Sequence, residues 1–237
     1  MQYFFRGHSN WEYKNIPSIY RGSSISNEDK MFYKAICSKP LEFTDDMSTF
    51  DKLVKMQHYE LPTRLLDITT NPLVALYFAC KEDDGRDGAV IIFSMSQDKI
   101  KNYNSDSVCI LSNLSKCSKD FKFNDDKDHL VYDIQQDKPN FKGEYLEESA
   151  INNVLCVFPK LNNDRIIRQS GAFFIFGMGK SKTEPAEFED APSVIKIKAD
   201  CKRDILEELQ LLGVDEATLF PETDKVMKQI KLQYIKD

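Results

Sequence analysis

The sequence predicts an α+β fold: a single domain with a mixed or antiparallel β core, flanked by helices and carrying a helical insertion. Short apolar runs bounded by turn residues, such as 89–95, alternate with segments of helical periodicity. Within 96–150 the composition changes to Lys, Asp, Asn and Ser with scattered apolar pieces. We therefore expect one domain over 1–237, in which 96–150 is a peripheral insertion that covers the core.

Composition narrows the class of protein. The 237 residues are 41% hydrophobic and 30% charged, which suits a globular chain with a sizeable core. A net charge of −6 argues against a protein that coats nucleic acid through a basic surface. No apolar run approaches the ~20 residues of a membrane span, and the first residues do not read as a leader. The six cysteines form no C-x-x-C pair, so we expect free, mostly buried thiols and a cytoplasmic protein.

The N-terminal third is predicted to contain a strand and three helices. The run 2–9 suits a strand whose end reaches a cleft, and a first helix follows Asn27. A second helix is expected from about Asp45 to His58. The following run, 60–70, contains Pro62 and is interpreted as a loop. A buried third helix then begins at Asn71, which precedes a proline at the first helical position.

The rest of the core is predicted from apolar runs. A strand is expected over 89–95, and two more in "NNVLCVFPK" and "GAFFIFG". "PSVIKIKA" is a short alternating strand. Asp200 is expected to cap an amphipathic helix that Gly213 closes, and a last helix is expected from about Thr223 to Tyr234.

The ordered set of motifs resembles the FRG domain family, which takes its name from the Phe-Arg-Gly found here at positions 5–7. Further matching segments are "PSIYRG", "QHYELPTRLLDITTNPLVALYFAC", "DGAVIIF", "RIIRQSGAFFIF" and "LEELQLLGVDEATLFP". Two positions depart from the family pattern. Glu60 stands where the family often has glycine, and Ile68 replaces a frequent tryptophan.

A fainter resemblance is to ADP-ribosyltransferases of the arginine–serine–glutamate class, and it implies an ADP-ribosyltransferase-like fold. In that class an arginine holds the phosphates of NAD and a Ser/Thr motif supports the nicotinamide half. Arg6 and the pair Thr69 and Thr70 take those places here. The class normally has a catalytic glutamate shortly before the G-x-F strand, but this chain has Arg168 and Gln169 there and no glutamate.

Arg6 and Gly7 are candidates for the ligand's phosphate. A guanidinium can donate two hydrogen bonds to a phosphate, and a glycine allows close approach of a ligand to the backbone. The alternative is a salt bridge from Arg6 to Asp67, which we interpret as structural. Arg64 is either a ligand-facing arginine or half of a buried ion pair.

Near the end of the second predicted helix, His58 can bond a ribose hydroxyl or carry a proton, or it can simply favour the helix C-terminus. Glu60 is the nearest carboxylate that could serve in catalysis. Thr69 and Thr70 can extend an anion site at the helix that begins at Asn71, or they can merely cap it. The Gln169 amide suits binding better than catalysis.

Two functional hypotheses follow. In the first, the protein is an intracellular toxin-like or phage-defence enzyme that takes NAD as its substrate, without a metal, and breaks the nicotinamide–ribose bond or transfers ADP-ribose to a protein or nucleic-acid acceptor. In the second, the same cleft is a non-catalytic module that recognises a nucleotide, a nucleic-acid end or a protein segment. Both predict that a set of distant residues converges on one concave site: Arg6, His58, Arg64, Thr69 and Gln169.

Overall fold

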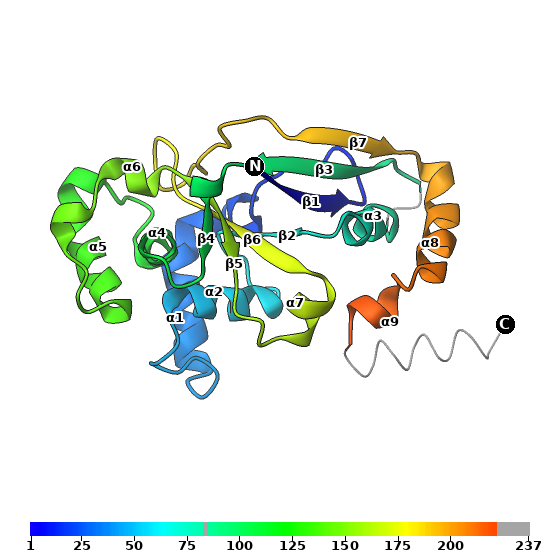
Figure 1. The fold of residues 1–237 in the computed structure, drawn as a ribbon. Helices are drawn as coiled ribbons and strands as arrows, with labels where there is room; N and C mark the ends of the chain where they lie inside the picture. The colour runs from blue at the N-terminus through cyan, green and yellow to red at the C-terminus, as the bar shows by residue number, and fades with distance from the viewer. Residues whose placement is uncertain (83–84, 222–237) are drawn as a thin grey trace.

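The computed structural model describes residues 1–82 and 85–221. Within these residues the centre is one seven-stranded sheet of order β4-β5-β6-β2-β1-β3-β7 (Figure 1). The strands are β1 (Gln2–His8), β2 (Leu65–Thr69), β3 (Gly88–Met95), β4 (Ile100–Asn102), β5 (Val154–Phe158), β6 (Gly171–Phe176) and β7 (Ser193–Ile197). Only β4 and β5 pair in parallel. The expected α+β fold with a mixed sheet is confirmed.

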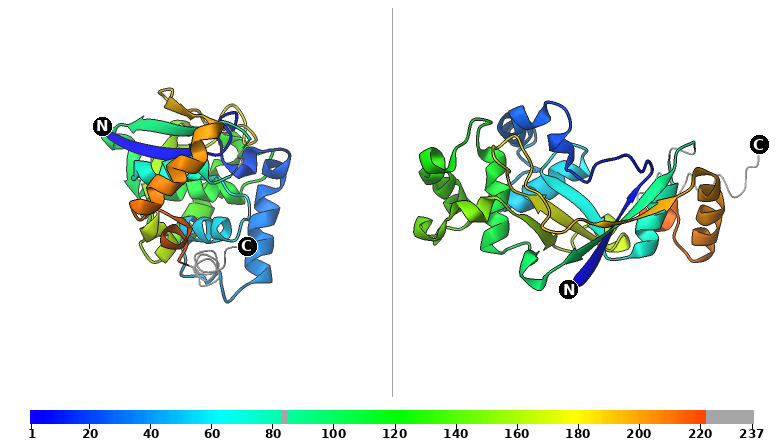
Figure 2. Two further views of the ribbon diagram at one scale, coloured as in Figure 1. Left: turned by 90° about the vertical axis from the view of Figure 1, so that its right-hand side faces the viewer. Right: turned by 90° about the horizontal axis from the view of Figure 1, so that it is seen from above.

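The helices gather in two groups along the sheet, as Figure 1 and the views in Figure 2 show. The first group lies near β4, β5 and β6, and it comprises α1 (Glu28–Ser38), α2 (Thr49–His58), α4 (Asp106–Asn113), α5 (Phe123–Asp137) and α6 (Glu148–Ile151). The second group lies near β1, β3 and β7, and it comprises α3 (Pro72–Cys80), α8 (Lys202–Leu211) and α9 (Glu216–Leu219). Between the groups lies α7 (Asp164–Arg168).

A strand replaces the loop that was predicted over 60–70. β2 pairs with β6 along its whole length and with β1 at one residue pair, which places it near the middle of the sheet. Its apolar residues Leu65, Leu66 and Ile68 are buried, whereas Asp67 is exposed. The prediction of a loop was wrong because the polar residues of this run conceal a strand of only five residues.

The starts of α2 and α3 follow local capping chemistry, whereas Asn27 precedes α1 without a side-chain capping bond. Ser48 caps α2 by accepting from the Asp51 amide at 3.1 Å, so this helix begins four residues after the expected Asp45. Asn71 caps α3 through the Leu73 amide, as expected.

The C-terminal helix expectations have mixed outcomes. Asp200 does not cap α8, because a short 3-10 turn over Ala199–Cys201 precedes that helix. Gly213 follows α8 with a φ of 76°, which confirms its place as the closing glycine. The helix expected over 223–234 lies outside the described residues.

The segment 96–150 is mostly helical, but it also enters the core. Val108 and Leu111 of α4 are fully buried and pack in the same apolar cluster as Leu65 of β2 and Phe173 of β6. The segment also supplies β4, which extends the sheet at its edge. It therefore builds one wall of the core in addition to covering it.

The state of the cysteines agrees with the expectation of free, mostly buried thiols, and the described helices agree with the expected lack of a membrane span. All six cysteines are free, four of them are buried, and only Cys37 and Cys201 are exposed. Among the described residues, no helix is both long and apolar enough to cross a membrane.

Candidate functional site

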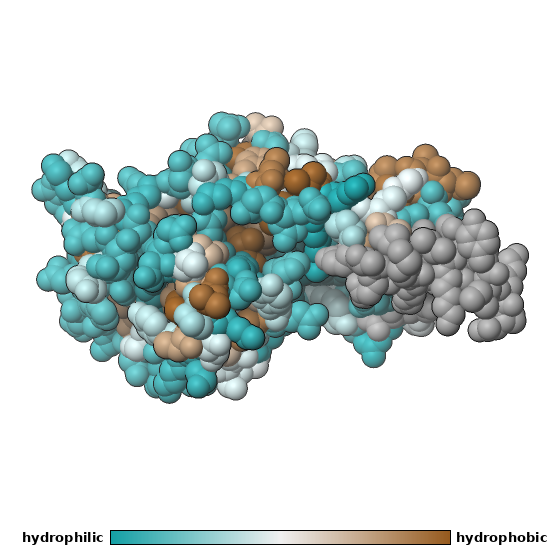
Figure 3. Space-filling view, turned by 90° about the horizontal axis from the view of Figure 1, so that it is seen from below, coloured by the Kyte–Doolittle hydropathy of each residue, from teal (hydrophilic) through white to brown (hydrophobic). Residues whose placement is uncertain are grey.

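A pocket of about 240 Å³ opens between the two groups of helices. Its lining comes from β1, β2 and β6 of the sheet, from the C-terminal end of α2, from α3 and from α7. The face of the molecule below the sheet, where α2, α3 and α7 lie, is largely hydrophilic with apolar side chains gathered in places (Figure 3). Segments far apart in the sequence therefore meet at one concavity.

The base of the pocket lies where β1 and β2 meet. These strands share one residue pair, Phe5 with Thr69, although each pairs fully with its other neighbour. Beyond that pair, the Arg6 guanidinium spans the junction, since its Nη1 donates to the backbone carbonyl of Asp67. The alternative expected for Arg6, a salt bridge to the Asp67 carboxylate, is not what forms.

Arg6 is also oriented by His8. Its Nε donates to His8 Nε2 at 3.0 Å, so this imidazole must be neutral at that nitrogen. Burial, and then the charges of Arg6 and Arg21, lower the pKa of His8 from 6.5 to about 4. The acceptor for Arg6 is therefore retained at neutral pH.

Most of the candidate residues converge as predicted. Arg6, Gly7, His58, Thr69 and Gln169 all line the pocket. His58 is exposed at the last position of α2. The prediction that five residues would meet at one concave site is thus confirmed for four of them: Arg6, His58, Thr69 and Gln169. Gly7 lines the same pocket.

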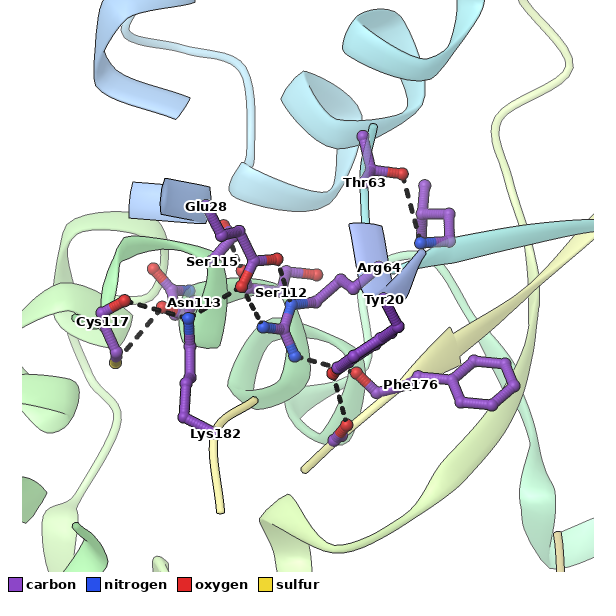
Figure 4. A network of polar contacts seen from close by, with 12 residues as sticks. Tyr20, Glu28, Thr63, Arg64, Ser112, Asn113, Ser115, Cys117, Phe176 and Lys182 are labelled. Carbon is purple, nitrogen blue, oxygen red and sulfur yellow. Dashed lines mark hydrogen bonds and ion pairs between the residues drawn. The ribbon is translucent and has the colours of Figure 1, made fainter. Parts of the chain in front are cut away.

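Arg64 is the exception, and its predicted place in the pocket was wrong. It is fully buried elsewhere, with Nε 2.9 Å from Glu28 Oε1, Nη2 also bonded to Glu28, and Nη1 donating to the Phe176 carbonyl. Lys182 Nζ lies 2.8 Å from the same Glu28 carboxylate, which sits between the two cations (Figure 4). Burial alone would raise the pKa of Glu28, but Arg64 and Lys182 outweigh burial and lower it.

Gly7 serves the packing of a helix. A Cβ at this position would lie 2.0 Å from the Ala75 carbonyl oxygen and 2.6 Å from the Ala79 amide nitrogen. Because both atoms belong to the backbone of α3, only a glycine lets β1 approach that helix so closely. The expectation that Gly7 makes room for a ligand is corrected: the close approach is to α3.

Thr69 and Thr70 perform local structural roles. The Thr69 hydroxyl donates to the Gln169 carbonyl at 2.7 Å and accepts from the Asn71 amide at 2.9 Å, and the Leu73 amide is taken by the Asn71 side chain. The start of α3 is therefore capped, and these two amides are not open to an anion. Thr70 does not line the pocket and bonds to the Ser170 carbonyl.

Glu60 does not line the pocket. It follows α2 with a φ of 64°, a left-handed conformation that glycine adopts at less cost. The family's frequent glycine at this position thus has a conformational reason, and the carboxylate of Glu60 is not placed to serve in the pocket.

Asp67 is the residue that the sequence did not reveal as part of the site. It lines the pocket, and its Oδ2 accepts from Gln57 Nε2 at 2.9 Å. The Thr63 hydroxyl donates in turn to Gln57 Oε1. Asp67 is the one carboxylate among the described lining residues. The signal in the sequence was an acidic residue between two apolar ones in a strand-length run.

Arg165 of α7 and Gln169, which follows this helix, are held in place by residues near the C-terminal end of the described chain. Gln169 Nε2 donates to the Leu219 carbonyl at 3.1 Å, and the Arg165 guanidinium lies over the Phe220 ring at 4.9 Å. Phe220 is itself buried and packs against Phe78 of α3. The segment after α8 therefore supports one wall of the pocket, and the Gln169 amide nitrogen is already engaged.

Fold and pocket together define an α+β protein with a cleft of mixed polar and apolar lining at the junction of two central strands. Comparison of the sequence with family models finds a match to the FRG domain over residues 1–88. This match confirms the resemblance that the N-terminal motifs predicted. No curated protein and no solved structure matches the chain.

Proposed function

We propose that this pocket binds NAD and that the protein is an ADP-ribosyltransferase-like enzyme or NAD glycohydrolase. The observation that carries the proposal is the convergence of Arg6, His58 and Gln169 on one pocket from three separate elements. Arg6 offers a guanidinium to the phosphates, and His58 offers an imidazole to a ribose hydroxyl. The oxygen of the Gln169 side chain can accept from the carboxamide of nicotinamide.

The size of the pocket sets how NAD would lie. Its volume of about 240 Å³ is below the ~300–1,000 Å³ typical of pockets that enclose a drug-sized ligand. We therefore place the nicotinamide–ribose half inside, with Phe5, Phe78 and Phe173 supplying apolar surface for the ring. The adenosine half would lie along the surface beyond Arg6. The proposed cellular setting, phage defence or a toxin acting on a protein or nucleic-acid acceptor, rests on the family resemblance alone.

The competing proposal is a non-catalytic module that recognises a nucleotide or nucleic acid with the same cleft. It is favoured by the engagement of Gln169 with Leu219 and by the exclusion of Glu60 from the lining. The two proposals share the binding step and differ in whether a bond is broken.

Titration calorimetry with NAD, together with an assay of nicotinamide release, tests the proposal. Wild-type protein should bind NAD, and Arg6→Ala should weaken binding by ~10–100-fold, the loss of one or two charge-assisted hydrogen bonds. Arg203→Ala is the matched control, because Arg203 is an exposed arginine on α8 that does not line the pocket. Binding without nicotinamide release, with or without cell extract as a source of acceptor, supports the module. Absence of NAD binding overturns the enzymatic proposal, and it leaves the module only a different nucleotide or a nucleic acid as its ligand.

A further inference from the structure

We propose that Asp67 is the catalytic carboxylate of this pocket and that Gln57 is its positioning residue. This inference rests on the proposed function, because it names the group that would act on the nicotinamide–ribose bond of NAD. In the ADP-ribosyltransferases that the sequence resembles, the catalytic glutamate precedes the strand that corresponds to β6 here. An aspartate in the neighbouring strand β2 takes its place.

The strand geometry presents this carboxylate to the pocket. Successive side chains of β2 alternate between faces, so Leu66 and Ile68 enter one apolar cluster while Asp67 points to the opposite face. Asp67 stands in register with Phe173 of β6, another lining residue. It is therefore carried by a central strand, which holds a side chain more rigidly than a loop does.

The hydrogen bonds of Asp67 leave its charge available. Gln57 holds Oδ2, and Oδ1 makes no hydrogen bond within the described residues. Among those residues the carboxylate forms no ion pair at contact distance, since Arg6 bonds to the backbone carbonyl of Asp67. The Arg6 guanidinium is near enough for the Asp67 charge to act on it, and that charge opposes the lowering of the Arg6 pKa by burial. Here one amide orients the carboxylate, and the residue lines the pocket.

Gln57 fixes the orientation of that carboxylate. Its Oε1 accepts from the Thr63 hydroxyl, which determines that Nε2 is the end directed at Asp67. Thr63 is 1% exposed, so this second partner is itself held by the core. The chain Thr63–Gln57–Asp67 thus runs from the buried interior to the pocket.

The reaction balances with water as the co-reactant. The bond between C1′ of the ribose and the nicotinamide nitrogen breaks, and its electron pair neutralises the pyridinium, so that neutral nicotinamide leaves. The Asp67 carboxylate stabilises the developing ribosyl cation. A water oxygen then bonds to C1′, and its proton passes to Asp67 and on to solvent. In a transfer reaction a nucleophile of the acceptor replaces the water.

The test compares wild type, Asp67→Asn, Gln57→Leu and a control, Asp164→Asn. Asp164 is an exposed aspartate in the first turn of α7 and does not line the pocket. In Asp67→Asn, kcat for nicotinamide release should fall by ~100–1,000-fold, the usual loss on removing one electrostatic stabiliser of a transition state. KM and the NAD affinity should change by about threefold or less, since the loss falls on the transition state.

Gln57→Leu should lower kcat by up to ~100-fold at unchanged KM, because it releases the carboxylate from its productive orientation. Thermal melting of each variant checks that the fold is kept. If wild type releases nicotinamide and Asp67→Asn does so at a similar rate, the role of Asp67 is overturned while the proposed function stands. Binding of NAD without nicotinamide release by wild type, with or without cell extract as a source of acceptor, overturns the proposed enzyme and with it the role of Asp67. An absence of NAD binding overturns them as well.

Discussion

Arg64 and Glu28 form an ion pair inside the core, with the Arg64 Nε 2.9 Å from Glu28 Oε1 and both side chains almost fully buried. Lys182 is the second cation on the same carboxylate. Two buried positive charges thus depend on one negative charge, and this balance makes Glu28 the critical member of the group.

We therefore expect Glu28→Gln to lower the free energy of unfolding by ~3–5 kcal/mol, the cost of leaving buried charges unpaired. Urea unfolding followed by circular dichroism measures the change. Glu42→Gln is the control, because Glu42 pairs with Lys55 at an exposed position, and this substitution should change the free energy of unfolding far less. Equal effects of the two substitutions would contradict the importance of the buried group.

His8 should make stability depend on pH in a defined window. Burial and the charge of Arg6 lower its pKa from 6.5 to about 4, so the unfolded chain binds more protons than the folded one between these values. The contribution of His8 is fully present above pH 6.5 and is lost as the pH falls toward 4. Urea unfolding at several pH values should show this slope, and His8→Gln should flatten it. A slope that His8→Gln leaves unchanged would contradict this role of His8.

Gly7→Ala should destabilise the protein by at least ~1–3 kcal/mol, because the new methyl group would overlap the backbone of α3. Thermal unfolding detects the loss. Gly85→Ala is the matched control, since a Cβ at Gly85 meets no atom within 4 Å. A normal melting temperature for Gly7→Ala would show that β1 and α3 are not packed as closely as described.

Glu60→Gly should stabilise the protein by ~0.5–1 kcal/mol. The left-handed backbone at Glu60 costs a residue with a Cβ ~1–2 kcal/mol, and the greater flexibility of glycine in the unfolded chain offsets part of the gain. Glu60→Ala separates charge from conformation, because it removes the carboxylate and keeps the Cβ. If alanine stabilises as much as glycine, the charge and not the φ angle is responsible.

Much of the sheet was readable from the sequence because its strands are apolar and flanked by turns. The runs of β3, β5 and β6 are buried on both faces, and such runs have few other interpretations. β2 was not readable, since Thr63, Arg64 and Asp67 make its neighbourhood look like a loop. The partners that accommodate these polar side chains in a strand lie elsewhere in the chain, so no local sequence pattern reveals them.

The sequence predicted roughly where the site lies, but it did not predict all of the residues that form it. Arg6, His58 and Gln169 lie beside apolar elements, and this placement predicted their convergence. Arg64 has the same local features, but its partner Glu28 is 36 residues away and draws it into the core. Asp67 was undervalued for the opposite reason: its orientation depends on a register with β6 that the sequence does not state.

The single residue pair between β1 and β2 has a consequence for the FRG match itself. Residues 1–88 contain those two strands but only the first residue of β3, and they exclude β6 altogether. Severed at residue 88, the chain would keep two strands joined through Phe5 and Thr69, and both outer edges of this pair would lose the neighbours β3 and β6. Such a fragment would lack most of the strand pairing that holds β1 and β2 in the sheet. In this protein, the unit of folding is therefore larger than the unit of sequence similarity.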